Sequence, residues 1–127
     1  MRSSLSGRRV VVTGGAGFVG SHLCDAVLRG GPESLAIVDD FSLGKERNIK
    51  GIRERKDVKV YRRDATDFTS MKEILKREGP DVVFNLAVIP LPMSLELPRE
   101  TIETNVRIAT NFCELLRGGA FKTLVHC

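Results

Sequence analysis

The chain of 127 residues lacks several features that mark whole classes of protein. No stretch approaches the roughly 20 consecutive apolar residues that a membrane-spanning helix requires, so we predict no membrane segment. The segment 1–9 is charged and contains no apolar core of a signal peptide. The three cysteines, Cys24, Cys113 and Cys127, are odd in number and include no Cys-x-x-Cys pair. This pattern is evidence against a disulfide framework or a metal site and favours a reducing, cytoplasmic location.

The remaining composition is that of an ordinary globular protein. Apolar residues make up 42% of the chain and charged residues 28%, which fits a single domain with its own core. The net charge is +4, but the stretch from Lys45 to Arg63 holds nine Lys or Arg against three acids. A nucleic-acid surface is one interpretation of this stretch. We favour a solvated loop followed by a protected edge strand, and therefore do not expect a nucleic-acid partner.

Short apolar strands alternate along the chain with helical segments. Strands are predicted at 9–13, 35–38, 58–63, 81–86 and 121–127. Helices are predicted at 18–29, from a capping box formed by Ser70 and Glu73 to Gly79-Pro80, and at 99–117, after a proline-containing loop at 90–98. Such alternation is typical of an α/β fold.

The expected architecture is a parallel sheet with helices on both faces, because crossovers between parallel strands are right-handed. The strands 10–13 and 82–86 are the most apolar and should be central, whereas the charged strand 58–63 should be an edge. This predicts the spatial order 3-2-1-4-5 of a doubly wound, three-layer Rossmann-type fold, truncated after its fifth strand. Residues 1–127 should then form one dinucleotide-binding domain, incomplete and without a substrate domain.

The strongest motif is the segment 13–20, Thr-Gly-Gly-Ala-Gly-Phe-Val-Gly, between the first predicted strand and helix. Gly14 would allow the tight turn, Gly17 the close approach of a pyrophosphate, and Gly20 the packing of the helix on the sheet. The phosphates would meet free backbone N–H groups and the positive end of the helix dipole. Because strand and helix flank the glycines, the pattern predicts a dinucleotide site and fits a methyltransferase less well.

An acidic residue follows the second predicted strand at the spacing that this site requires. Asp39 lies 19 residues after Gly20, and an acid about 20 residues on hydrogen-bonds the ribose hydroxyls of the adenosine. A carboxylate there repels a 2′-phosphate, so NAD is predicted and NADP is disfavoured. Asp40 could share the role, and both aspartates could instead only form a turn.

A series of motifs resembles the extended short-chain dehydrogenase/reductase family, which includes UDP-glucose 4-epimerase and the nucleotide-sugar dehydratases and decarboxylases. The likeness covers essentially the whole chain in the right order. It is carried by the segments 13–23, 38–42, 64–67, 81–87, 104–106 and 124–127, together with Pro98. Each motif is loose alone, and their series is specific. The resemblance implies an NAD-dependent enzyme that acts by transient hydride transfer at a hydroxyl of a nucleotide sugar.

The resemblance also implies cofactor contacts at individual positions. Backbone N–H groups of Phe18 and Val19 would contact the pyrophosphate, and Asp64, with Ala65 beside it, would accept from the adenine amino group. Leu86 and Ala87 would line the path of the nicotinamide ribose. Two further positions are implied as contacts, Ser42 in the segment after the second strand and Thr104, where some members have asparagine. Asp64 could instead cap a turn, and Leu86 and Ala87 could be core.

The sequence departs from the family in ways that bear on catalysis. Asn85 replaces a common histidine, and Val88 replaces a small residue and could narrow the channel. The family uses a Ser or Thr after the fifth strand and a later Tyr-x-x-x-Lys, in which the lysine lowers the pKa of the tyrosine. The single tyrosine, Tyr61, is followed four residues later by Ala65. We therefore assign no catalytic residue and expect no turnover from this chain alone.

Two further alternatives stay open. A dinucleotide-binding module without catalysis is the alternative to the cofactor-binding part of an epimerase, dehydratase or decarboxylase. The helix 99–117 carries apolar residues at helical spacing, namely Ile102, Val106, Ala109, Cys113 and Leu116. This stripe could pack on the sheet, or it could form a homodimer face, since related enzymes pair through helices at this position.

Overall fold

The computed structural model describes residues 4–127. Residues 1–3, which belong to the predicted domain and to the segment inspected for a signal peptide, lie outside the described residues. The elements follow in the order β1 (Arg9–Thr13), α1 (Phe18–Arg29), β2 (Ser34–Asp39), α2 (Glu46–Ile49), β3 (Val58–Arg62), α3 (Phe68–Glu78), β4 (Val82–Asn85), α4 (Leu91–Glu96), α5 (Pro98–Arg117) and β5 (Thr123–His126). Within this part of the chain, every helix is too short or too polar to cross a membrane.

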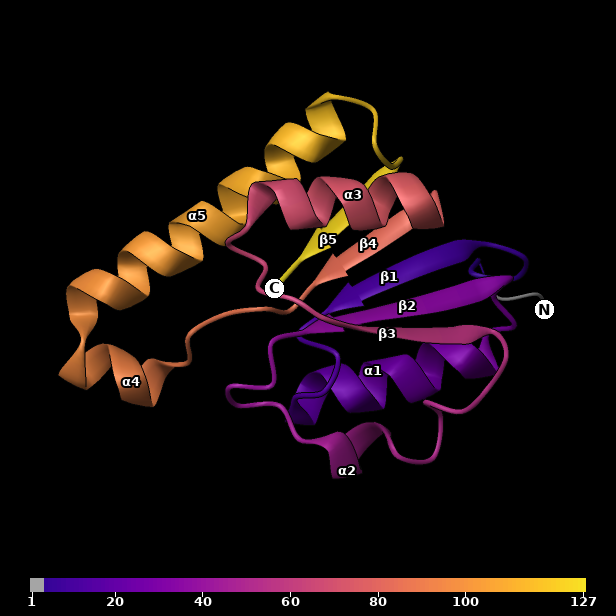
Figure 1. Ribbon diagram of the computed structural model, residues 1–127, viewed down its shortest axis with the longest axis horizontal. Helices are drawn as coiled ribbons and strands as arrows, with labels where there is room; N and C mark the ends of the chain where they lie inside the picture. The colour runs from indigo at the N-terminus through magenta and orange to yellow at the C-terminus, as the bar shows by residue number, and fades with distance from the viewer. Residues whose placement is uncertain (1–3) are drawn as a thin grey trace.

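The five strands form one parallel sheet in the order β3-β2-β1-β4-β5. This confirms the predicted α/β class and strand order, with β1 at the centre and the charged β3 at an edge. Thr13, the last residue of β1, pairs with Val38 of β2 and Asn85 of β4. Because all strands are parallel, their carboxyl ends lie along the same side of the sheet, where their arrowheads point in Figure 1.

Helices cover both faces of the sheet, which confirms the three-layer arrangement. In Figure 1, α3 and α5 lie on one face, and α1 and α2 lie on the other. The central strand supplies both cores: Val11 packs in the cluster that contains Phe112 of α5, and Val10 and Val12 pack in the cluster that contains Cys24 of α1. Side chains of a strand alternate between faces, so an entirely apolar β1 is expected for a strand buried on both sides.

The start of α3 differs from the prediction. The helix begins at Phe68 and its N-cap is Asp67, whose carboxylate accepts from the backbone N–H of Ser70 at 3.1 Å. The predicted capping box of Ser70 and Glu73 is therefore wrong, because Ser70 already lies in the first turn. An aspartate is as good an N-cap as a serine and occupies the position three residues earlier.

Two short helices were not predicted. The segment 90–98, predicted as a loop, contains α4, with Pro92 in its first turn. Proline is tolerated there because the first N–H groups of a helix have no intrahelical acceptor, so its presence did not exclude a helix. The other short helix, α2, lies in the basic stretch between β2 and β3.

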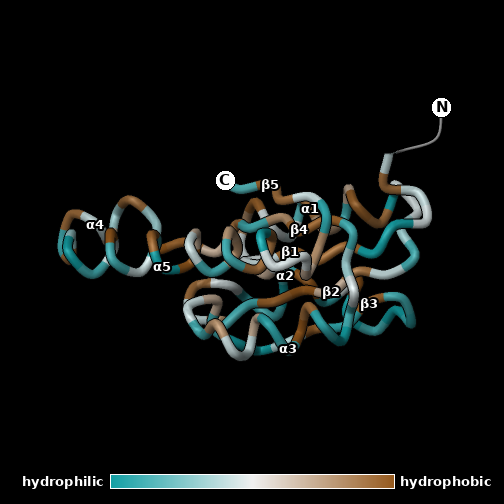
Figure 2. Tube along the Cα trace, turned by 90° about the horizontal axis from the view of Figure 1, so that it is seen from above, coloured by the Kyte–Doolittle hydropathy of each residue, from teal (hydrophilic) through white to brown (hydrophobic). Residues whose placement is uncertain are grey.

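The predicted apolar stripe of α5 packs on the core only near the end of the helix, where Leu116 joins it. The buried side chains of the helix include Ile108, Phe112 and Leu115, whereas Ile102 and Val106 are 64% and 58% exposed. Packing of the stripe on the sheet is therefore excluded for these two residues. Figure 2 shows that α4 and the first half of α5 extend away from the rest of the molecule, with apolar segments along them.

Candidate functional site

The predicted cofactor residues lie at the carboxyl ends of β1, β2, β3 and β4, in the loops that follow these ends, at the start of α1 and in the first half of α5. In parallel α/β sheets, ligands bind outside the carboxyl ends, at the point where the strand order reverses. Here that point lies between β1 and β4, because successive strands run from β1 outward to β3 and then restart at β4 on the other side. The fold thus brings these loops to one side of the sheet.

The first turn of the glycine segment is held against the loop after β4. Gly14 has a φ of +68°, and a Cβ added to it would lie 2.7 Å from the backbone of Leu86. Both facts require glycine at this position. A Cβ on Gly20 would lie 2.0 Å from the carbonyl oxygen of Gly14, so the neighbour that excludes a side chain at Gly20 is the loop itself rather than the strands.

Gly17 is under a much weaker constraint from the protein. It is the N-cap of α1 with φ −74° and ψ 177°, which any residue can adopt, and its Cβ would meet only the Gly14 carbonyl oxygen, at 3.3 Å. The N–H groups of Phe18, Val19 and Gly20 have no acceptor in residues 4–127, since the first intrahelical bond is donated by Ser21 to Gly17. Three free donors thus lie around a position kept open by glycine.

Asp39 ties the end of β2 to the glycine segment. Its carboxylate accepts from the backbone N–H of Ala16 at 2.9 Å and from that of Phe41 at 2.8 Å, and only 8% of the residue is exposed. A carboxylate has about four acceptor positions, so these two bonds fix its orientation and leave it able to accept more. The neighbouring Asp40 is exposed and accepts from the backbone and the hydroxyl of Ser42.

The peptide of Ala16 is held from its other side by a residue that the sequence analysis missed. The side-chain amide of Asn48 donates to the Ala16 carbonyl at 2.8 Å, and the backbone N–H of Lys45 donates to the same oxygen at 3.0 Å. The segment after β2 therefore fixes the centre of the glycine loop. An asparagine three residues after a lysine carries no recognisable signal by itself.

The loop between β3 and α3 places Asp64 at the surface and buries Ala65. One oxygen of Asp64 accepts from the backbone N–H of Thr66 at 2.8 Å, which closes a short turn. Ala65 is 6% exposed and packs in the core with α3 and α5. Asp64 is thus both a turn-forming residue and an exposed carboxylate at the carboxyl end of the sheet.

The loop after β4 is bonded to β1 and to α5. Leu86 donates its N–H to the Thr13 carbonyl at 3.1 Å, and Ala87 donates its own to the Thr13 hydroxyl at 3.4 Å. Asn105 of α5 pairs with both backbone groups of Ile89, at 2.7 and 3.1 Å. Thr104 precedes Asn105, is half-buried, and makes no side-chain hydrogen bond within the described part of the chain.

Asn85 joins three strands beneath this loop. Its side chain accepts from the Thr13 hydroxyl and lies 2.8 Å from Nδ1 of His126, so a polar row runs from β1 through β4 to β5. The residue is fully buried, and each of its polar groups has a partner. Asn85 thus bonds to a side chain of each neighbouring strand.

Tyr61 does not belong to the site. Its hydroxyl donates to the buried carboxylate of Glu78 at the end of α3, and burial together with this bond raises the pKa of Tyr61 above its usual range. The position four residues on is Ala65, so no Tyr-x-x-x-Lys is present in the chain. Among residues 4–127, no group of three or more His, Cys, Asp or Glu could hold a metal ion.

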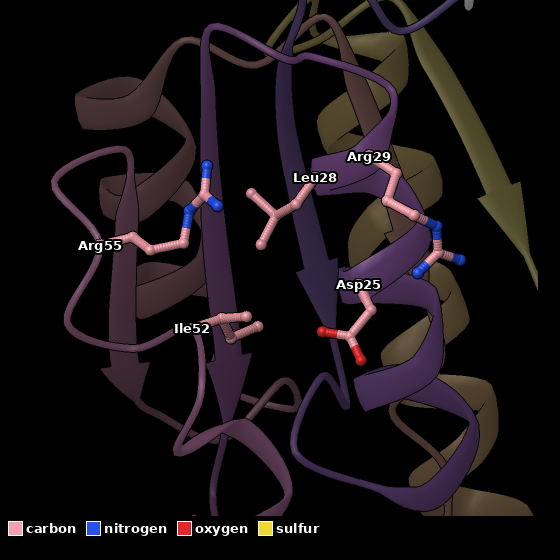
Figure 3. Close-up of a pocket in the computed structure, with 5 residues that line it drawn as sticks. All are labelled: Asp25, Leu28, Arg29, Ile52 and Arg55. Atoms are coloured by element: carbon pink, nitrogen blue, oxygen red, sulfur yellow. The ribbon is translucent and has the colours of Figure 1, made fainter.

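A groove of about 310 Å³ lies between the second half of α1 and the segment that follows α2. Figure 3 shows its lining residues, Asp25, Leu28, Arg29, Ile52 and Arg55. None of them belongs to the predicted cofactor contacts. The groove is therefore separate from the site at the carboxyl ends of the strands.

The basic stretch is partly neutralised by local acids. Glu46 accepts from both Arg53 and Arg62, and Asp57 pairs with Arg55 at 2.8 Å. The guanidinium of Arg55 also holds the pKa of Asp57 below its usual range. Such pairing favours the interpretation as a solvated loop and an edge strand over a nucleic-acid surface.

Comparison with known proteins agrees with this geometry. Residues 10–127 match the NAD dependent epimerase/dehydratase family. The chain belongs to this family. UDP-glucuronic acid decarboxylase 2 of Arabidopsis thaliana is 36% identical over 101 residues, which cover 79% of this chain and 21% of the plant protein. UDP-N-acetyl-alpha-D-glucosaminuronate decarboxylase of Bacillus cytotoxicus is 31% identical over 118 residues, covering 92% and 35% of the two chains.

Solved structures of family members share the fold. The epimerase Mth375 of Methanothermobacter thermautotrophicus superposes with a TM-score of 0.84 at 28% identity, covering 97% of this chain and 35% of its own. The Bordetella bronchiseptica enzyme WbmF, solved in complex with NAD+, gives 0.83 at 28% identity, covering 98% and 37%. This chain thus spans between about a fifth and two fifths of the length of these relatives.

Proposed function

We propose that this chain binds NAD and forms the cofactor-binding part of an enzyme that acts on a nucleotide sugar. The observation that carries the proposal is the set of three acceptor-free N–H groups on Phe18, Val19 and Gly20, beside the open position at Gly17. Free N–H groups at a helix N-terminus favour a bound diphosphate, and the helix dipole adds to the attraction. The protein itself gives little reason for glycine at position 17, so a ligand is the simplest explanation.

The remaining contacts follow from the same placement. Asp39, and Asp40 with Ser42 next to it, would accept from the hydroxyls of the adenosine ribose. Asp64 and Ala65 would contact the adenine, and Leu86, Ala87 and Thr104 would line the nicotinamide end. When bound, NAD supplies the acceptor for a hydride from a sugar hydroxyl, and these residues hold it in place.

NAD rather than NADP is proposed because of Asp39. Its carboxylate is fixed by the N–H groups of Ala16 and Phe41, at 2.9 and 2.8 Å, and the residue is buried. A 2′-phosphate carries about −1.5 to −2 charges at neutral pH and would be repelled by a fixed carboxylate beside the ribose. Hydroxyl groups, in contrast, can donate to the two acceptor positions that remain.

Calorimetric titration of the chain with NAD and NADP tests the proposal. We expect saturable binding of NAD and at least tenfold weaker binding of NADP, which corresponds to about 1.4 kcal/mol. Asp39→Ala should weaken NAD and remove most of the discrimination. Asp25→Ala, which removes an exposed carboxylate of α1 outside the site, is the matched control and should leave both affinities unchanged. Equal NAD affinity in wild type and Asp39→Ala would overturn the assignment.

Catalysis needs groups that this chain does not supply. We propose that the family reaction, whether epimerisation, dehydration or decarboxylation, requires a Ser or Thr just after the fifth strand and a later Tyr-x-x-x-Lys. Neither can be assigned in this sequence, so we expect no turnover from this chain alone. Incubation with NAD and UDP-glucose or UDP-glucuronate should yield no new nucleotide sugar. Conversion at an enzymatic rate would contradict this proposal. A non-catalytic dinucleotide-binding module is the alternative, and the open reading frame beyond Cys127 distinguishes the two.

We further propose that α5 forms a homodimer face in a reducing, cytoplasmic setting. The stripe of Ile102 and Val106 is exposed although the opposite face of the helix is buried. Exposed apolar stripes of this kind mark association surfaces. Val106→Glu should convert a dimer into a monomer in light scattering, whereas Arg107→Glu, beside the stripe, should not; a monomeric wild-type protein would refute the proposal.

A further inference from the structure

Asn111 is a buried polar residue of α5 that reaches the loop between β3 and α3. Only 8% of its surface is exposed. Its side-chain Nδ2 donates to the carbonyl oxygens of Ala65 at 2.9 Å and of Thr66 at 3.0 Å. Both acceptors follow Asp64 directly. One amide group on α5 therefore holds the backbone of the loop at the two residues that follow Asp64.

At its ends the loop is bonded to β2, where Arg63 donates its N–H to the Asp39 carbonyl at 3.2 Å, and to α3, which Asp67 caps. The bonds made by Asp64 itself are internal to the loop. Asp64 accepts from the Thr66 N–H through its side chain at 2.8 Å and from the Asp67 N–H through its carbonyl at 3.0 Å. These bonds define the shape of the turn, but they do not join it to another element. The bonds from Asn111 do so, because the helix that carries it packs on the sheet through Phe112.

Two neighbouring groups of this loop remain free in residues 4–127. The backbone N–H of Ala65 has no acceptor, and only one of the two carboxylate oxygens of Asp64 has a donor. One free acceptor next to one free donor is the complement of the adenine edge, which offers an amino group and an unprotonated ring nitrogen. A 6-oxopurine offers the reverse pattern, a carbonyl oxygen and a ring N–H, so each of its groups would face a like group.

We infer that Asn111 is a positioning residue that makes the site selective for adenine over 6-oxopurines. This inference rests on the proposed function, since it concerns the adenine end of the same site. Selectivity requires the Asp64 carboxylate and the Ala65 N–H to keep one fixed orientation, so that each faces its matching group on the base. Without the Asn111 amide, two inward carbonyls lose their donor and the turn can rotate to present either pattern.

The experiment measures the dissociation constants of NAD and of its 6-oxo analogue, nicotinamide hypoxanthine dinucleotide, by calorimetry. Wild type should prefer NAD by about tenfold or more, the scale of a mispaired hydrogen bond to a charged group. Asn111→Leu, which removes the donor, and Asn111→Asp, which replaces it with an acceptor of the same shape, should both lower the preference below about threefold. Thr101→Val is the matched control, because Thr101 is a buried polar residue of α5 that bonds only to Leu97.

The ratio of the two constants is the decisive readout. A variant that is partly unfolded weakens both ligands by the same factor and leaves the ratio unchanged, so loss of stability cannot imitate the expected result. A tenfold ratio retained in both Asn111 variants would overturn the inference and leave the proposed function intact. Wild type that binds neither dinucleotide would overturn both, and wild type that binds both equally would overturn the adenine assignment and this inference with it.

Discussion

Alanine substitutions at Gly17 and Gly20 should separate ligand binding from folding. A Cβ on Gly20 would lie 2.0 Å from the Gly14 carbonyl oxygen, so α1 or the loop must shift by more than an atomic contact tolerates. Overpacking of this kind costs about 3 kcal/mol, a large part of a typical stability of about 5–15 kcal/mol. At roughly 3–5 °C per kcal/mol for a chain of this size, the melting temperature of Gly20→Ala should fall by about 10 °C.

Gly17→Ala should behave in the opposite way. Its φ and ψ of −74° and 177° suit alanine, and the nearest contact of its Cβ is 3.3 Å. A loss of about 0.5–1 kcal/mol at an N-cap is offset by about 0.4–1 kcal/mol from the stiffer unfolded chain. The melting temperature should therefore change by less than about 4 °C, while NAD affinity falls at least tenfold, or about 1.4 kcal/mol.

Scanning calorimetry and titration of the two variants provide the assay. If the melting temperature of Gly20→Ala equals that of wild type, the reasoning is refuted, because the loop would then tolerate the added Cβ. It is equally refuted if Gly17→Ala binds NAD with the affinity of wild type, because the space beside Gly17 would then not be occupied by the cofactor.

Three further outcomes are expected. Burial raises the pKa of the Cys24 thiol to about 12, so a thiol reagent at pH 8 should label the two exposed cysteines quickly and Cys24 only after unfolding; three fast thiols would contradict this. A backbone N–H and a lysine hold the pKa of Asp81 below its usual range, so its stabilisation is present above about pH 4 and is lost as the pH falls through the lowered value. The melting temperatures of wild type and Asp81→Asn should accordingly converge in acid, and a constant gap would be inconsistent. Phe112→Ala, at a fully buried position, should lower the unfolding free energy by about 3–5 kcal/mol in urea denaturation, and a change below about 1 kcal/mol would disagree with the packing of α5.

The strand order, and the predicted position of the cofactor site, followed from local patterns in the sequence. Each inner strand is apolar enough to be buried on both faces, and the glycine segment stands where a strand passes into a helix. These features depend on residues close together in the chain. The hydrogen bond between Ala16 and Asn48 does not, because it joins the glycine loop to α2, 32 residues later, and the two meet only after the sheet has formed.

Helix α5 shows why its contacts could not be predicted. Its apolar period marks the stripe through Ile102 and Val106, but the face toward the sheet contains Asn111 beside Phe112 and is no more apolar. Two apolar faces on one helix leave the periodicity unable to choose between them. The buried asparagine is stable there because two carbonyls accept from it, and those carbonyls come from a loop distant in sequence.

The central claim is that the amides at the start of α1 bind the diphosphate of NAD, and amide NMR spectroscopy tests it directly. Addition of NAD to the ¹⁵N-labelled chain should shift the N–H signals of Phe18, Val19 and Gly20, together with that of Ala65. Signals around the groove at Ile52 should stay in place. Unchanged spectra at saturating NAD, or shifts confined to that groove, would contradict the account.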